Sequence, residues 1–199
     1  MSKTNNNLKG NDMKMIQRWT TNTIILGLFL TFGFGQTSAY AASAAEIDAE
    51  VGVAQKQLAA SSPTAVELSA VAKGILIFPD MIKAGLIVGG QYGQGALLIN
   101  DTTVGYYNSV AASYGLQAGA QSFGYAMLLM TDKALSYLKS SSGWEIGVGP
   151  SVVVVDKGVA KSLTTTTAKD DVYVFFFDQE GLMAGLGVQG SKITQIHPD

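Results

Sequence analysis

The 199-residue sequence contains no cysteine, which excludes disulfides, thiolate metal sites, thiol nucleophiles and lipid attachment through cysteine. Its one histidine, His197, lies in "IHPD" near the C-terminus, where chains commonly fray. A zinc site or a serine nucleophile would have to depend on that residue. We therefore expect no catalytic residues, no metal site and no cofactor, and the sequence predicts a non-enzymatic protein.

Residues 1–41 have the organisation of an export signal. Lys14 and Arg18 precede the apolar run Ile24–Phe34, and "SAYAA" offers a small-residue cleavage site after Ala41. The run is shorter than the roughly 20 apolar residues of a transmembrane helix, although an uncleaved anchor is the alternative. Translation starting at Met13 would leave residues 1–12 outside the protein. We expect an exported protein, periplasmic or secreted, and not a lipoprotein.

Basic residues are scarce beyond the signal. From residue 42 onward there are nine lysines, no arginine and fourteen carboxylates, which gives a net charge of −5. Nucleic-acid binding depends on cationic side chains that displace counterions from phosphates, so nucleic acid is not expected as a partner. Strong electrostatic attachment to anionic lipid is not expected either.

Hydrophobic spacing predicts helices first and strands afterwards. Residues 42–62 predict an N-terminal helix, and Ser62-Pro63 predicts the start of a short second helix that Gly74 ends. From Ile75 the period becomes that of strands, with turns expected at Asn100-Asp101 and at 178–181. Thr131 is expected to cap one helix in the middle of the chain. The predicted class is α+β, with a strongly curved antiparallel sheet or barrel-like core.

The pentapeptide Gly-Leu-x-x-Gly occurs three times, as "GLIVG" at 85–89, "GLQAG" at 115–119 and "GLMAG" at 181–185. In an extended strand its two glycines would share one face, and Leu with a small apolar residue the other. Such bare faces allow a sheet to coil sharply or a second backbone to approach. Glutamines interrupt every candidate membrane span, and no Gly-Lys-Ser/Thr phosphate loop follows. The structural glycines predicted in this way are Gly85, Gly89, Gly115, Gly119, Gly181 and Gly185.

Three stretches together resemble the SYLF domain, also called the Ysc84-type actin-binding or lipid-binding domain. They are "AKGILIFPDMIKAGLIVGGQYGQGALL", "VGYYNSVAASYGLQAGAQSFGYAMLLMTDKALSYLKSSSGWEIG" and "GLMAGLGVQGSKITQI". The resemblance covers about Pro63 to Ile196 and implies that residues 63–199 form an α+β, SYLF-type domain. It also implies binding to phospholipid membranes, to which an amphipathic N-terminal helix contributes in eukaryotic members. Some relatives bind actin, but actin is an improbable target for an exported protein.

Lipid contact is accordingly the leading functional hypothesis. Candidate contacts are three apolar residues of the first helix and three lysines: Ile47, Val51, Leu58, Lys56, Lys73 and Lys83. In the alternative interpretation the apolar stripe packs on the sheet and the lysines are solvated. Two other functions stay open. One is an envelope protein-interaction module, and the other is a carrier of a small apolar ligand inside a barrel, suggested by "VFFF" and Tyr106-Tyr107.

Carboxylates are the remaining reactive groups, and most of them lie at predicted turns and helix caps. There they accept backbone N–H bonds, which explains their presence without any chemistry. The Asp170-Asp171 pair is the alternative, as a cation site, and Glu145 stands beside Trp144. The carboxylates considered are Asp80, Asp101, Asp132, Glu145, Asp156, Asp170 and Asp171.

Overall fold

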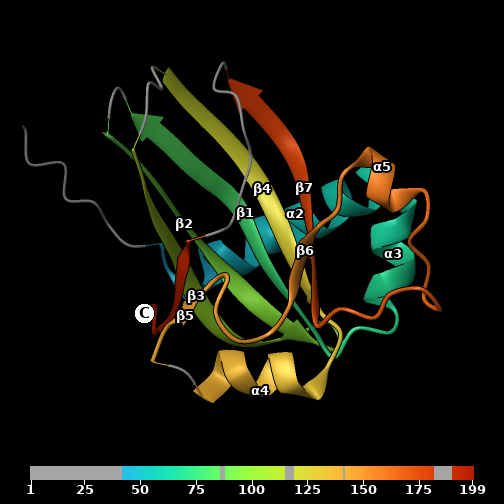
Figure 1. Cartoon of the computed structure of the whole chain (residues 1–199). Coiled ribbons are helices and arrows are strands. Elements are labelled where there is room, and N and C mark those ends of the chain that lie inside the picture. The colour runs from blue at the N-terminus through green and yellow to red at the C-terminus, as the bar shows by residue number, and fades with distance from the viewer. Residues whose placement is uncertain (1–41, 86–87, 115–118, 141, 182–189) are drawn as a thin grey trace, which may run out of the picture. The chain divides into compact units, whose positions relative to one another are not determined.

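The structure is a computed structural model that describes residues 42–85, 88–114, 119–140, 142–181 and 190–199. An eight-stranded sheet in the order β5-β8-β3-β2-β1-β4-β7-β6 curls into a half-barrel (Figure 1). The expected signal at 1–41 lies outside the described residues. The α+β class, the N-terminal helices and the helix in the middle of the chain are confirmed.

The four longest strands follow one another along the chain. They are β1 Gly74–Gly85, β2 Val88–Ile99, β3 Thr102–Tyr114 and β4 Gly119–Leu129. The later strands are β5 Trp144–Glu145, β6 Val152–Val154, β7 Val172–Gly181 and β8 Lys192–Ile196. Asn100 and Asp101 have φ of 51° and 58° in the β2–β3 turn, as the sequence predicts for that dipeptide.

Two details of the strand prediction were wrong. The sheet is mixed, because β6 pairs with β7 in parallel while the other pairs are antiparallel. No hairpin turn separates 178–181 from the preceding strand: β7 continues to Gly181, and the positive φ of 49° at Asp178 accompanies a shift in its register with β4. A shift of this kind bends a strand without ending it.

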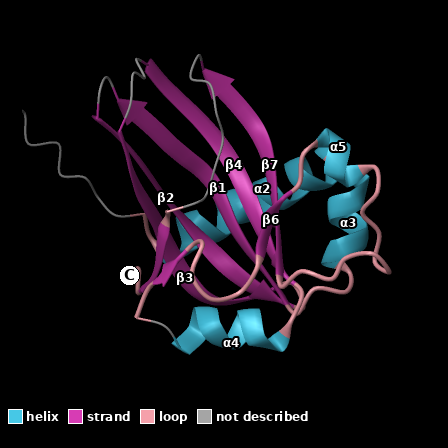
Figure 2. Ribbon diagram, viewed as in Figure 1, coloured by secondary structure: helices cyan, strands magenta, loops and turns pink. Residues whose placement is uncertain are grey.

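Helices lie on both faces of the sheet (Figure 2). They are α2 Ala44–Ser61, α3 Pro63–Ser69, α4 Asp132–Ser140 and α5 Lys157–Ala160. A capping box starts α2, in which the Ser43 side chain accepts from the Glu46 N–H and the Glu46 carboxylate accepts from the Ser43 N–H. The predicted caps at Ser62 and Thr131 are confirmed, since their side chains accept from the N–H groups of Ala65 and Ala134.

Two apolar cores cover the two faces. On the α4 face, Leu138 of α4 and the indole of Trp144 pack against sheet residues such as Phe78 and Tyr125. On the α2 face, the buried stripe of α2 packs against residues including Ile77 and Phe175. The apolar strand β7 is therefore covered on both faces, as its sequence predicts. Residues 41–199 make one compact unit that contains both cores.

Candidate functional site

Described glycines from all three pentapeptides lie at one end of the sheet, which we call the glycine-rich end. Gly85, the last residue of β1, is the register partner of both Gly89 in β2 and Gly119 in β4. Gly181, the last residue of β7, is the partner of Gln121 in β4. Figure 1 shows the ends of β1, β4 and β7 together, away from α4.

For the first pentapeptide, 85–89, this arrangement corrects the expectation of one extended segment. Gly85 and Gly89 face each other from two different strands, so the chain reverses between them. A Cβ on Gly85 would collide with the Cα of Gly89, so the two backbones approach too closely for a side chain there. Gly115 and Gly185 lie outside the described residues.

A row of exposed apolar side chains crosses three strands near the glycine-rich end. Ile82 of β1 is the register partner of Tyr92 in β2, and Tyr92 is the partner of Val110 in β3. Their exposed fractions are 56%, 48% and 46%. Val88, nearer the end of β2, is 66% exposed. We call these four residues the apolar patch.

The patch lies on the α2 face, just beyond the part of the sheet that α2 covers. The backbone N–H of Ala42 points to the Gln94 side chain, with 3.4 Å between the nitrogen and Oε1, and Gln94 is two residues from Tyr92 on the same strand. The next register positions beyond the row, Ala84 with Gly90 and Ala112, carry small side chains. On that side the patch therefore borders small side chains, whereas in the row itself Val110 is the register partner of the exposed Lys192 of β8.

The structure places the predicted lipid contacts of α2 against the sheet. Ile47, Val51 and Leu58 are 1%, 2% and 5% exposed, which is the packing arrangement that the sequence left as the alternative. Contact of these three side chains with lipid would require α2 to leave the sheet. α2 is stabilised in place by hydrogen bonds of Asp48 with Thr103 and Tyr106.

The three predicted lysines do not gather around α2 as one site. Lys56 is exposed on α2, and Lys73 is exposed before β1, where its N–H donates to the Leu129 carbonyl. Lys83 is half-buried and shares a register row with Gln91 and Gln121 on the α4 face. The structure therefore does not assemble the six predicted residues into one surface.

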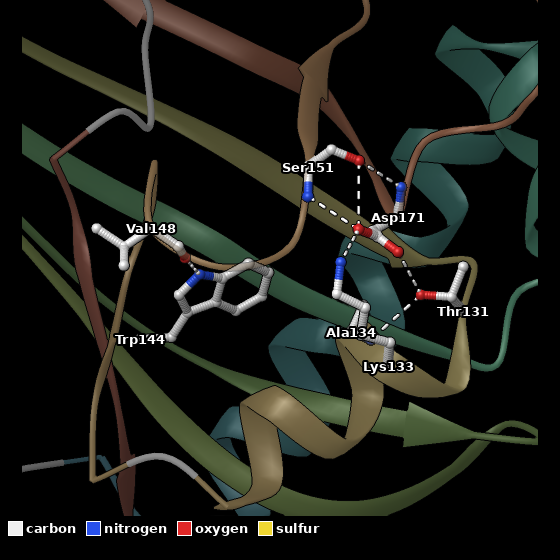
Figure 3. Close-up of polar contacts among 7 residues, drawn as sticks. All are labelled: Thr131, Lys133, Ala134, Trp144, Val148, Ser151 and Asp171. Carbon is white, nitrogen blue, oxygen red and sulfur yellow. Dashed lines mark hydrogen bonds and ion pairs between the residues drawn. The ribbon is translucent and has the colours of Figure 1, made fainter.

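The carboxylate of Asp171 accepts hydrogen bonds from two distant segments of the chain, at 131–133 and at 151 (Figure 3). It accepts hydrogen bonds from Lys133 Nζ at 3.0 Å, from the Ser151 N–H at 3.0 Å and from Thr131 Oγ1 at 2.8 Å. These bonds, led by the one from Lys133, lower the pKa of Asp171 from 3.8 to about 2. Together they connect the start of α4 to the edge of the sheet, a structural role.

The other carboxylates considered have cap and surface positions. Asp156 caps α5 and accepts from the N–H groups of Gly158 and Val159, which lowers its pKa. Asp170 accepts from the Tyr173 hydroxyl at 3.3 Å. Glu145 is exposed beside Trp144, whose buried indole N–H donates to the Val148 carbonyl (Figure 3). Within the described residues no three potential metal-ligating side chains cluster.

The features that suggested a ligand-carrying barrel have other roles. Tyr107 is buried in the core of the α4 face, and the phenylalanines of β7 pack on both faces of the sheet. A pocket of about 260 Å³ lies elsewhere, between α2, α3 and β1. It is lined by Gln55, Leu58, Ala59, Val66, Ser69, Ile75, Ile77 and Asp101.

The apolar patch was not predicted from the sequence. Its residues alternate with buried residues, as in ordinary strands. Which of the outward side chains stay uncovered depends on where the N-terminal end of α2 lies on the sheet. The irregular pairing between Ile77 and Ile82 adds to the difficulty, because it changes which β1 residues face α2. None of the helices that the structure describes is long and apolar enough to span a bilayer.

Of two comparisons with known proteins, one found a match. No curated protein matches the chain. The model of the Ysc84 family, described as "Las17-binding protein actin regulator", matches residues 110–197. This range runs from within β3 to the end of β8 and includes Gly119 and Gly181 of the glycine-rich end. This match agrees with the resemblance in the sequence motifs: residues 110–197 are similar to the Ysc84, or SYLF, domain family.

Proposed function

We propose that this protein associates with phospholipid membrane surfaces through the apolar patch, without catalysing a reaction. The observation that carries the proposal is the adjacency of Ile82, Tyr92 and Val110, three large side chains each about half exposed on neighbouring strands. Contiguous exposed apolar surface on a folded domain marks an interaction site. The similarity of residues 110–197 to a family with lipid-binding relatives supports a bilayer as the partner.

The side chains of the patch suit the boundary between headgroups and acyl chains. Each is already about half buried, so transfer of its remaining surface into an apolar phase contributes roughly 1 kcal/mol. Tyrosine adds an amphipathic ring of the kind enriched at membrane interfaces. Three or four such contributions give a weak, reversible association.

Charge adds little to this association. The net charge from residue 42 onward is −5, so an anionic bilayer attracts the domain no better than a zwitterionic one. We therefore propose binding that depends on apolar insertion and changes little with salt. We also propose that the protein is exported, as the sequence of residues 1–41 suggests.

Flotation with phosphatidylcholine vesicles tests the proposal on residues 42–199, the unit that contains both cores. The triple variant Ile82→Ser, Tyr92→Ser, Val110→Ser is expected to lose at least tenfold in recovery with vesicles. The matched control changes three exposed valines elsewhere, as Val53→Ser, Val71→Ser, Val154→Ser, and is expected to float like the wild type. Equal loss in both variants, or no flotation of the wild type, would contradict the proposal.

A protein partner is the second candidate for the same patch, since the family description names Las17 binding and actin regulation. An envelope protein suits an exported chain better than actin. Capture of a protein from envelope extract, lost in the patch variant and accompanied by no flotation, would favour this candidate.

A further inference from the structure

The buried polar side chains of the described residues gather in one place. Among those residues, the four polar side chains that are buried lie on the α4 face toward the glycine-rich end: Gln91, Ser109, Gln121 and Ser191. Toward α4 the same face is apolar, with Leu76, Met127 and Leu129. The core therefore changes from apolar to polar along the strands.

Three of the four have hydrogen-bond partners. Gln91 Nε2 donates to Ser191 Oγ at 3.2 Å, and the Tyr125 hydroxyl donates to Ser109 Oγ at 2.9 Å. Gln121 differs. It is 3% exposed, and neither its Nε2 nor its Oε1 has a hydrogen-bond partner in the described part of the chain. A buried amide without partners is destabilising, and native proteins keep few of them.

Gln121 has two polar neighbours in one register row. Lys83 of β1 is the partner of Gln91 in β2 on one side and of Gln121 in β4 on the other. Side chains at such positions stand about 5 Å apart on the same face. Lys83 is half-buried and lies two residues from Gly85, where β1 ends, so the row borders solvent.

The unpaired atoms define the chemistry of a ligand. Gln121 offers a donor and an acceptor on one planar group, and a pair of neighbouring hydroxyls satisfies both, because one accepts from Nε2 while the other donates to Oε1. An apolar ligand would leave the amide unpaired, and a metal ion would find no carboxylate in the row. We propose that Gln121, with Gln91 and Lys83 beside it, binds the vicinal hydroxyls of a polyol, meaning a glycerol or sugar unit.

This inference goes beyond membrane association and does not depend on it. The hydroxyls can belong to a free sugar or glycerol, or to the headgroup of a lipid such as phosphatidylglycerol. The row lies on the α4 face, whereas the apolar patch lies on the α2 face. Loss of one site should therefore leave the other intact.

The test measures the side-chain amide resonances of Gln121 by ¹H–¹⁵N NMR on residues 42–199. The probes are glycerol, methyl α-D-glucopyranoside, and small bicelles of phosphatidylcholine with or without phosphatidylglycerol. We expect a saturable shift of the Gln121 resonances with at least one hydroxylated probe and none with phosphatidylcholine alone. In Gln121→Leu the affinity for that probe, followed by backbone resonances, should fall at least tenfold, whereas Gln195→Leu, at an exposed glutamine of β8, should not change it.

Thermal unfolding without any probe supplies the second readout. If the Gln121 amide has no partner in the free protein, Gln121→Leu should unfold at the same temperature as the wild type or higher. A lower unfolding temperature would show that a bound water already satisfies the amide, and this would overturn the proposal. Absence of a shift with every hydroxylated probe, or equal affinity in the two leucine variants, would also overturn it.

Discussion

Gly95 of β2 lies directly against the backbone of Ile77 in β1: a Cβ placed on Gly95 would collide with the Ile77 carbonyl group. The pairing of the two strands is irregular between Ile77 and Ile82, a segment that contains Pro79. Two residues away, a Cβ on Gly93 would collide with Met81 and with the Asp80 carbonyl. Glycines in β2 therefore accommodate the bulge in β1, which in turn sets the face on which Ile82 emerges.

We expect Gly95→Ala to destabilise the domain by about 1–3 kcal/mol, because the methyl group meets backbone atoms that cannot move aside. Gly90→Ala in the same strand is the matched control. The nearest atom to its new Cβ would be the Ala111 carbonyl oxygen at 3.8 Å, and its effect should stay within about 0.5 kcal/mol. Urea unfolding measures both variants, and equal effects would contradict the role of the close approach.

Asp171 makes the free energy of unfolding depend on pH in the acidic range. Its pKa in the folded protein, about 2, lies below the ordinary value of 3.8, so the folded state binds this proton less tightly than the unfolded state does. The stabilisation from the carboxylate is then complete above about pH 4 and is lost as the pH falls toward 2. Since the Lys133 side chain is 66% exposed and solvent screens the pair, the contribution is about 1–2 kcal/mol.

Asp171→Asn is therefore expected to lower the free energy of unfolding at pH 7 by that amount and to flatten its pH dependence between 4 and 2. Glu67→Gln, at an exposed position of α3, is the control and should change neither. The measurement is urea unfolding at a series of pH values. If the free energy of unfolding of Asp171→Asn fell between pH 4 and 2 as steeply as that of the wild type, other groups would be responsible for the acid dependence.

The apolar stripe of α2 should affect stability and not membrane association. Ile47 is 1% exposed, so Ile47→Val removes one buried methylene and should cost about 0.5–1.5 kcal/mol in the free energy of unfolding. Val53→Ala on the same helix, where the side chain is 56% exposed, should cost little. Neither variant should change flotation with vesicles. A loss of flotation in Ile47→Val alone would show that the apolar stripe of α2 contacts the membrane.

Much of the fold could be predicted from local signals. Ser62-Pro63 and Thr131 fix helix starts through side chains that accept backbone N–H bonds, and Asn100-Asp101 fixes a turn through its tolerance of positive φ. The parallel pairing of β6 could not be predicted, since it depends on where the chain returns after α4.

The candidate site was harder to predict than the fold. Ile47 of α2 and Tyr92 of β2 both read as apolar residues with the period of their element, yet one is buried and the other is half exposed. The difference arises because α2 covers the sheet only as far as Gln94, which is a matter of tertiary packing. The register row of Gln121 likewise depends on pairings between distant strands.

The central claim is that the apolar patch enters the bilayer while the rest of the surface stays in water. The sequence has no cysteine, so a nitroxide can be attached to residues 42–199 at one introduced cysteine, Val110→Cys in the patch or Val53→Cys on α2. Power-saturation electron paramagnetic resonance with phosphatidylcholine vesicles then compares the access of oxygen and of a water-soluble nickel complex to each label. The account predicts that the label at 110 becomes accessible to oxygen and shielded from nickel, while the label at 53 stays accessible to nickel. Equal nickel access at both positions in the vesicle-bound protein would contradict it.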